Sequence, residues 1–144
     1  MSIEDIGRTH MFDYDVDDVY LNMRDVGTIT FYVHEVDGAT SSTITFSDDT
    51  SGTTTSTPDV IDHYYGKSVD TASNAWHLTT QTAAETVVAT DATEDLIAIT
   101  VTEEMCPDGK PYVKCTSDGA ATVAAVFGAL QEQRDPENIV SYRT

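Results

Sequence analysis

Three aspartates at alternate positions are the clearest candidate for metal chemistry in this sequence. The run Asp-x-Asp-x-Asp at residues 13–17 matches the first ligands of a calcium-binding loop, whose carboxylate oxygens suit a hard cation. That loop requires glycine at its sixth position and glutamate at its twelfth, where this chain has Asp18 and Arg24. Phe12 and Tyr14 alternate with the carboxylates, and edge strands commonly carry charge that blocks unwanted pairing. The run therefore predicts an edge strand or extended arm, with calcium binding as the minor alternative.

The two cysteines, Cys106 and Cys115, flank a turn at residues 107–111. In a hairpin around this turn the two sulfur atoms are about three residues out of register, or roughly 10 Å apart, which is too far for a disulfide bond. A zinc site needs more ligands at closer spacing than two cysteines and four scattered histidines provide. We therefore expect two free, partly buried thiols and no bound metal.

No catalytic constellation is apparent in the sequence. It contains no Gly-x-Ser-x-Gly elbow, no His-Glu-x-x-His motif, no phosphate loop and no dinucleotide fingerprint. His63 has no second titratable partner at a fixed spacing, so it is interpreted as a packed aromatic residue and not as a base. The sequence predicts neither enzymatic activity nor a cofactor.

Aromatic residues offer a different chemistry, the stacking of sugar rings. Tyr64, Tyr65 and Trp76 would form a glycan platform if all three were exposed and coplanar. A single tryptophan in a small β domain belongs more often to the core, and we expect that of Trp76. A carbohydrate-binding or adhesion module is kept as the alternative function.

Charge restricts the possible partners. The 144 residues include 25 Asp and Glu against 7 Lys and Arg, a formal net charge of −18 at pH 7. Such a field repels phosphates, so we expect no binding to nucleic acid or to anionic membranes. The scarcity of lysine and the abundance of Asp and Thr suggest a high-salt habitat, although an ordinary acidic surface explains them equally well. The first residues lack the features of a signal peptide, and no apolar run is long enough to span a membrane, so we expect synthesis in the cytoplasm of the host.

A hairpin is the strongest structural prediction. Ile29 and Phe31 belong to an alternating apolar run that precedes Asp-Gly at residues 37–38, the dipeptide preferred in two-residue hairpin turns. With that turn, Phe31 pairs with Ile44 and Ile29 pairs with Phe46, so that their large side chains share one face. This agreement between turn and pattern predicts an all-β fold.

Further strands are expected along the rest of the chain, giving seven to nine in total. They are predicted at residues 12–16, 19–23, 60–67, 86–89, 96–102, 112–117 and 120–130. Residues 47–58 are expected to form a surface loop. The turn at residues 107–111 allows two registers, with Met105 opposite either Tyr112 or Val113. The spacing of strands predicts a single β-sandwich, jelly-roll or immunoglobulin-like, over residues 19–130. Residues 1–18 form an N-terminal arm and residues 131–144 a C-terminal tail.

Residues 21–31, 107–113 and 119–126 resemble small head-decoration (cement) proteins of tailed phages and archaeal tailed viruses. Such proteins look alike in their opening Asn-Met strand, their Ser/Thr/Gly-rich middle and their final Ala-Val strand. The resemblance implies a β-sandwich in the virion, on the outer surface of the capsid, bound to the major capsid protein and to copies of itself. It carries over no catalytic residue. The strong acidity and the tripeptide Arg-Asp-Pro at residues 134–136 depart from the pattern.

Apolar residues in both terminal segments are the predicted contacts. Because apolar side chains outside a core suggest docking, we expect these residues to touch the capsid or a neighbouring subunit. They are Ile3, Ile6, Met11, Phe12, Ile139, Val140 and Tyr142. A position in the tail or at the head-tail joint of the virion is a further alternative.

Overall fold

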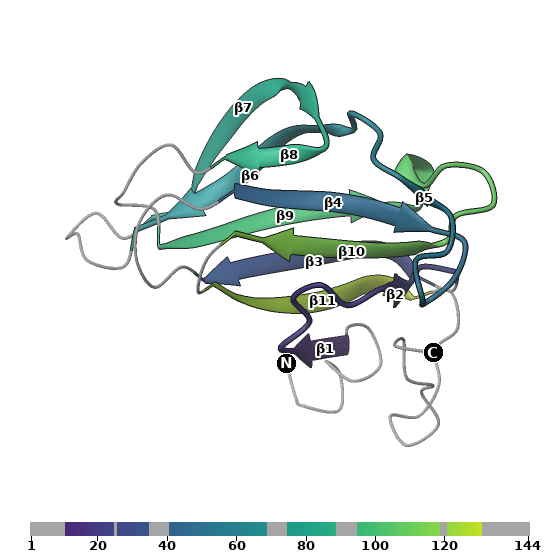
Figure 1. Ribbon diagram of the computed structural model, residues 1–144. Coiled ribbons are helices and arrows are strands. Elements are labelled where there is room, and N and C mark those ends of the chain that lie inside the picture. Colours follow the sequence, from purple (N-terminus) through teal and green to yellow (C-terminus); the bar gives the residue numbers. More distant parts are fainter. Residues whose placement is uncertain are drawn as a thin grey trace.

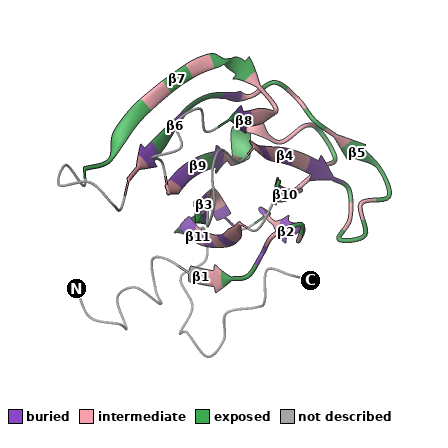
Figure 2. Cartoon of the chain, turned by 60° about the vertical axis from the view of Figure 1, so that its left-hand side comes forward, coloured by how far each residue is buried: buried purple, intermediate pink, exposed green. Residues whose placement is uncertain are grey.

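Two antiparallel sheets pack face to face in the computed structural model, which confirms the predicted all-β sandwich (Figures 1 and 2). The structure describes residues 11–24, 26–34, 41–68, 75–88, 95–118 and 121–130. Within these ranges no helix is long and apolar enough to cross a membrane.

The larger sheet has six strands, which run along one face of the sandwich (Figure 2). Their spatial order is β1 (Met11–Tyr14), β11 (Thr122–Leu130), β3 (Val26–His34), β9 (Leu96–Thr102), β6 (Ile61–Lys67) and β7 (His77–Ala84). Strand β9 occupies the predicted segment, and β1 is the edge strand that the alternating aspartates indicated. Strand β7 was not predicted.

The smaller sheet has five strands and covers the other side of the core. Its order is β2 (Leu21–Asn22), β10 (Tyr112–Ser117), β4 (Ser41–Ser47) and β5 (Thr55–Ser56). Strands β5 and β8 (Thr86–Val88) pair with the same edge of β4, β5 near its end and β8 near its beginning. A short 3₁₀ helix, η1 (Glu103–Met105), lies between β9 and β10.

The chain changes sheet at most of its connections, and this overturns the predicted hairpin. Strand β3 pairs with β9 and β11, whereas β4 lies in the other sheet, so Phe31 is paired with Ile99 and Ala125 and not with Ile44. The apolar pattern is satisfied either way. In a hairpin the alternate apolar residues of both strands lie on one shared face. When the two strands belong to facing sheets, the same residues are buried against each other across the core.

The expected hairpin around residues 107–111 is wrong for the same reason. Strands β9 and β10 belong to different sheets, so neither predicted register occurs. Met105 lies in η1, and Tyr112 pairs instead with Asn22 and Ser47. The two cysteines are nevertheless free thiols, as expected.

The core lies between the sheets and consists of the alternate residues of each strand that face inward. From β3 come Ile29, Phe31 and Val33, and from β4 come Ile44 and Phe46, all fully buried. Phe127 of β11 is buried among them. Strand β11 is less buried on its outer side than predicted, because Ala124 and Val126 are only half-buried.

Residues 11–18 belong to the sandwich and not to a separate arm. Strand β1 pairs with β11, and Val16 is fully buried, its backbone N–H donating to the Val123 carbonyl at 2.9 Å. Asp17 accepts a hydrogen bond from the Ser117 N–H at 2.9 Å. The segment that precedes β2 is therefore fixed to both sheets.

Candidate functional site

The predicted glycan platform does not form as proposed, because one of its tyrosines lies in the core. Tyr64 is only 2% exposed, and its hydroxyl donates to the Val88 carbonyl at 3.2 Å. Neighbouring residues of a strand point to opposite faces, so Tyr64 points inward and Tyr65 outward. Trp76 is 43% exposed, contrary to the expectation that it belongs to the core.

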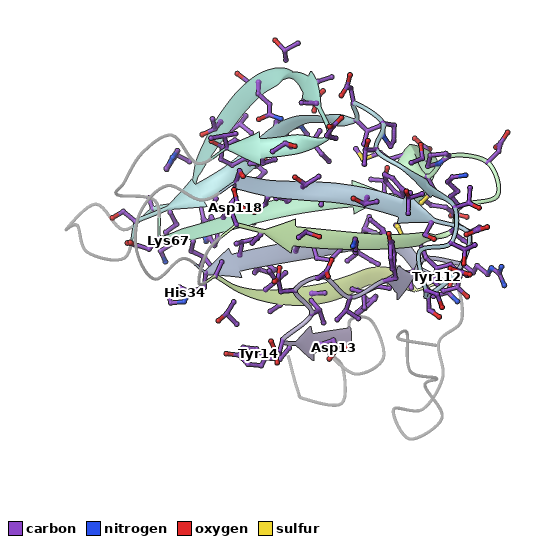
Figure 3. All side chains as sticks on the ribbon, in the orientation of Figure 1. Asp13, Tyr14, His34, Lys67, Tyr112 and Asp118 are labelled. Atoms are coloured by element: carbon purple, nitrogen blue, oxygen red, sulfur yellow. The ribbon has the colours of Figure 1, made fainter. Side chains whose placement is uncertain are left out.

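The structure instead brings other residues together on the outer face of the six-stranded sheet. The strand pairings connect one outward-facing residue from each strand: Tyr14 with Ala124, Ala124 with Tyr32, Tyr32 with Ala98, Ala98 with Tyr65, and Tyr65 with Leu78. We call these six residues the aromatic row. The row crosses all six strands at right angles to their direction, with Tyr14 on the edge strand β1 (Figure 3).

Tyrosine and alanine alternate along the row. Adjacent strands are about 4.8 Å apart, so the three tyrosines recur roughly every 10 Å. Tyr14 is 62% exposed, Leu78 54% and Tyr65 45%, while Tyr32 is half-buried. Of the two alanines between the tyrosines, Ala98 is buried at 8% exposed and Ala124 is half-buried.

Two further aromatic rings contact Tyr32 and Tyr65, the tyrosines in the middle of the row. Trp76 meets Tyr32 at a centroid distance of 6.2 Å and 67° between planes, and His63 meets Tyr65 at 6.3 Å and 85°. Both geometries are edge contacts, which aromatic pairs prefer. The Lys67 ammonium lies 5.9 Å from the centre of the Trp76 ring, a cation–π distance. The aromatic rings therefore support one another and are not isolated side chains.

Carboxylates are missing from the registered positions around the row. On one side lie the half-buried or exposed threonines of β3 and β9, with Thr28 opposite Thr102 and Thr30 opposite Thr100. The row on the other side consists of Thr122, His34, Leu96 and Lys67. Figure 3 shows His34 and Lys67 at this end of the sandwich. In a chain with 25 acidic residues, none of the positions named in these rows is acidic.

The nearest described carboxylate on β6 is that of Asp62, which lies at the irregularity between Ile61 and His63. Its Oδ1 is 2.6 Å from His63 Nδ1, so this charge is engaged by a neighbouring histidine. The middle of the face, around Tyr32 and Tyr65, thus carries little negative charge, whereas Asp13 and Asp15 flank Tyr14 at the β1 edge.

The outer face of the smaller sheet has a different chemistry. A depression of about 510 Å³ there is lined by hydroxyl groups, by Asp18, Asp118 and Tyr20, and by Lys114. The Lys114 ammonium donates to Asp18 and lies 4.9 Å from the Tyr20 ring centre. That hydrogen bond lowers the pKa of Asp18. Burial lowers the pKa of Lys114, but the hydrogen bond to Asp18 and the charge interactions with Tyr20, Asp18 and Asp17 together outweigh it, so the net shift is upward. Lys114 and Asp18 thus satisfy each other's charges.

The two thiols are poor nucleophiles. Burial raises the pKa of Cys106 to about 11 and that of Cys115 to about 12. The Cys106 thiol donates to the Met23 sulfur at 3.5 Å, within a depression at one end of the sandwich. Among the residues whose positions are described, no three His, Cys, Asp or Glu side chains lie close enough to hold a metal ion.

The predicted capsid contacts lie outside what the structure describes. Ile3, Ile6, Ile139, Val140 and Tyr142 fall beyond the described ranges, and for Met11 and Phe12 only the backbone, within β1, is described. They remain predictions.

Comparisons with protein-family models, with curated proteins and with solved structures find no match to this chain. The candidate sites therefore depend on the geometry given above. The aromatic row had only a weak signal in the sequence. Its members come from six strands, and they lie side by side only because of the register in which those strands pair.

Proposed function

We propose that this protein is a non-catalytic structural protein of a virion, a decoration (cement) protein that binds the outer surface of the major capsid lattice and stabilises it. One structural observation carries the proposal further than the sequence resemblance. The chain enters the sandwich at Met11, which pairs with Phe127, and β11 ends three residues later at Leu130. The two points are roughly 10 Å apart at about 3.3 Å per residue.

Both terminal segments are consequently tethered at one corner of a rigid body. Residues 1–10 carry Ile3 and Ile6, and residues 131–144 carry Ile139, Val140 and Tyr142. Two short tethered segments raise the effective concentration of each for a surface that the other has bound. A repeating lattice offers such a surface many times, so weak contacts add up to firm attachment.

Salt dependence follows from the charge. A net charge of −18 makes neighbouring copies repel one another. Added salt shortens the range of this repulsion to about 10 Å or less. We therefore expect the density of bound protein to rise with ionic strength, the opposite of binding driven by surface ion pairs.

Co-sedimentation with empty capsid shells from the same genome, at high salt, tests this function. Binding that saturates at a lattice-like stoichiometry is expected. Deletion of residues 1–10 or 131–144 leaves β1 and β11 intact. Each truncated protein should therefore keep its thermal unfolding transition but no longer bind the shells. Retained binding by both truncations, or no binding of the full chain to intact shells, contradicts the proposal.

A further inference from the structure

We propose that the aromatic row binds a neutral polysaccharide chain, which lies across the strands of the six-stranded sheet. This inference concerns a second surface and is independent of attachment to a capsid. It replaces the platform of Tyr64, Tyr65 and Trp76 with residues that the fold places side by side on one sheet face.

The spacing of the rings is the first argument. Sugar rings present flat C–H faces that pack on aromatic faces, and such sites place a few aromatic side chains beside polar groups. The tyrosines of the row recur roughly every 10 Å, because one strand with an alanine separates each pair. That interval is close to the length of two linked pyranose units. An extended chain therefore meets Tyr14, Tyr32 and Tyr65 with every second sugar.

Hydroxyl groups beside the row are the second argument. Thr30 and Thr100 face each other with their Oγ1 atoms 3.0 Å apart, and Thr28 and Thr102 form the next pair. Each threonine hydroxyl both donates and accepts hydrogen bonds, which matches the hydroxyls of a sugar. The rings and the threonines thus offer apolar and polar contacts side by side.

Charge selects the class of polysaccharide. The aromatic row and the paired positions beside it on β3 and β9 carry no carboxylate, and Lys67 is the nearest lysine, in a chain of net charge −18; Asp13 and Asp15 flank Tyr14 at the β1 edge. An anionic polymer is repelled by the field of the whole protein, whereas a neutral polymer is not. The occupant is therefore an uncharged, extended chain of linked pyranose sugars, such as a β-1,4-linked glucan.

Binding can be followed through Trp76, the only tryptophan of the chain, which contacts Tyr32. Titration with a β-1,4-linked glucose hexasaccharide should shift its fluorescence, and insoluble β-1,4-glucan should retain the protein. Tyr65→Ala and Tyr32→Ala should each weaken retention about tenfold, the usual effect of losing one stacked ring.

Tyr112→Ala is the matched control, since Tyr112 lies on the smaller sheet, at the opposite end of the sandwich from His34 and Lys67 (Figure 3). Its retention should equal that of the unmodified protein. Because Tyr65 is exposed, its replacement leaves the core intact and keeps the test valid if Tyr32→Ala unfolds.

No retention on β-1,4-glucan together with an unchanged Trp76 spectrum overturns the inference, as does an equal loss in Tyr112→Ala and Tyr65→Ala. The proteins truncated at residues 1–10 or 131–144 should still bind the glucan. Failure of this inference is thus separate from failure of capsid binding.

Discussion

A pair of engineered cysteines tests the way in which the chain alternates between sheets. Thr30 and Thr100 lie opposite each other on β3 and β9, and their Oγ1 atoms are 3.0 Å apart. Sulfur atoms in those places need to approach by only about 1 Å to bond. The double variant Thr30→Cys, Thr100→Cys should therefore form a disulfide on mild oxidation.

The expected gain in stability follows from the length of the closed loop. The two positions are 70 residues apart, and the chain-entropy relation then gives about 4 kcal/mol. For a chain of this size that corresponds to a rise in the unfolding temperature of roughly 10 to 15 °C. Scanning calorimetry of the oxidised and reduced forms measures the difference. The native thiols should not interfere, because burial keeps them protonated.

The matched control is Thr30→Cys, Thr45→Cys. The hairpin expected from the sequence pairs these two residues, but Thr45 lies in the depression on the outer face of the other sheet. The sheets are about 10 Å apart and the two side chains point away from each other, so no disulfide should form. A disulfide in this control, with none in Thr30→Cys, Thr100→Cys, would refute the assignment of β3 and β4 to different sheets.

Two other predictions concern titration. At pH 7.5 iodoacetamide should modify Cys106 about a hundredfold more slowly than an ordinary cysteine and Cys115 more slowly still, because the raised pKa values leave little thiolate. Mass spectrometry of the folded protein, with a denatured control, measures the labelling. Rapid labelling in the folded state would contradict this prediction. Hydrogen bonds from Thr53 lower the pKa of Asp49 below its ordinary value near 3.8. This stabilisation is therefore fully present above about pH 5 and is lost as the pH falls through the lowered pKa. Asp49→Asn should lower the unfolding temperature at pH 7 but not near pH 2, and an equal loss at both would disprove the linkage.

The sequence predicted which residues face the core better than it predicted which strands pair. The alternation through Ile29, Phe31 and Val33 identified three fully buried side chains. Alternation defines a face, however, and the face is the same whether β4 lies beside β3 or across the core from it. The Asp-Gly dipeptide at residues 37–38 favoured the hairpin, and no local signal opposed it.

Strand β9 was predicted at its observed bounds because Leu96–Thr102 is a continuous apolar, β-branched run. Strand β7 was missed because His77–Ala84 lacks such a pattern; it is largely exposed, and among the described strands it pairs with β6 alone. The aromatic row could be foreseen only in part. The alternation in β3 places Tyr32 outward, but its meeting with Tyr65 depends on Ala98 of β9, a register fixed by the whole sheet.

The central position of the last strand has a consequence for biosynthesis. Strand β11 lies between β1 and β3, and Val33 pairs with Ile97 and Val123, about 60 and 90 residues further along. The larger sheet therefore cannot close until residues 122–130 have left the ribosome, and folding that waits for such distant partners is slow. Until then at least one edge of β3 lacks its partner, a state prone to aggregation. The large negative charge keeps such incomplete chains apart, so the acidity that opposes crowding on a surface also protects the nascent protein.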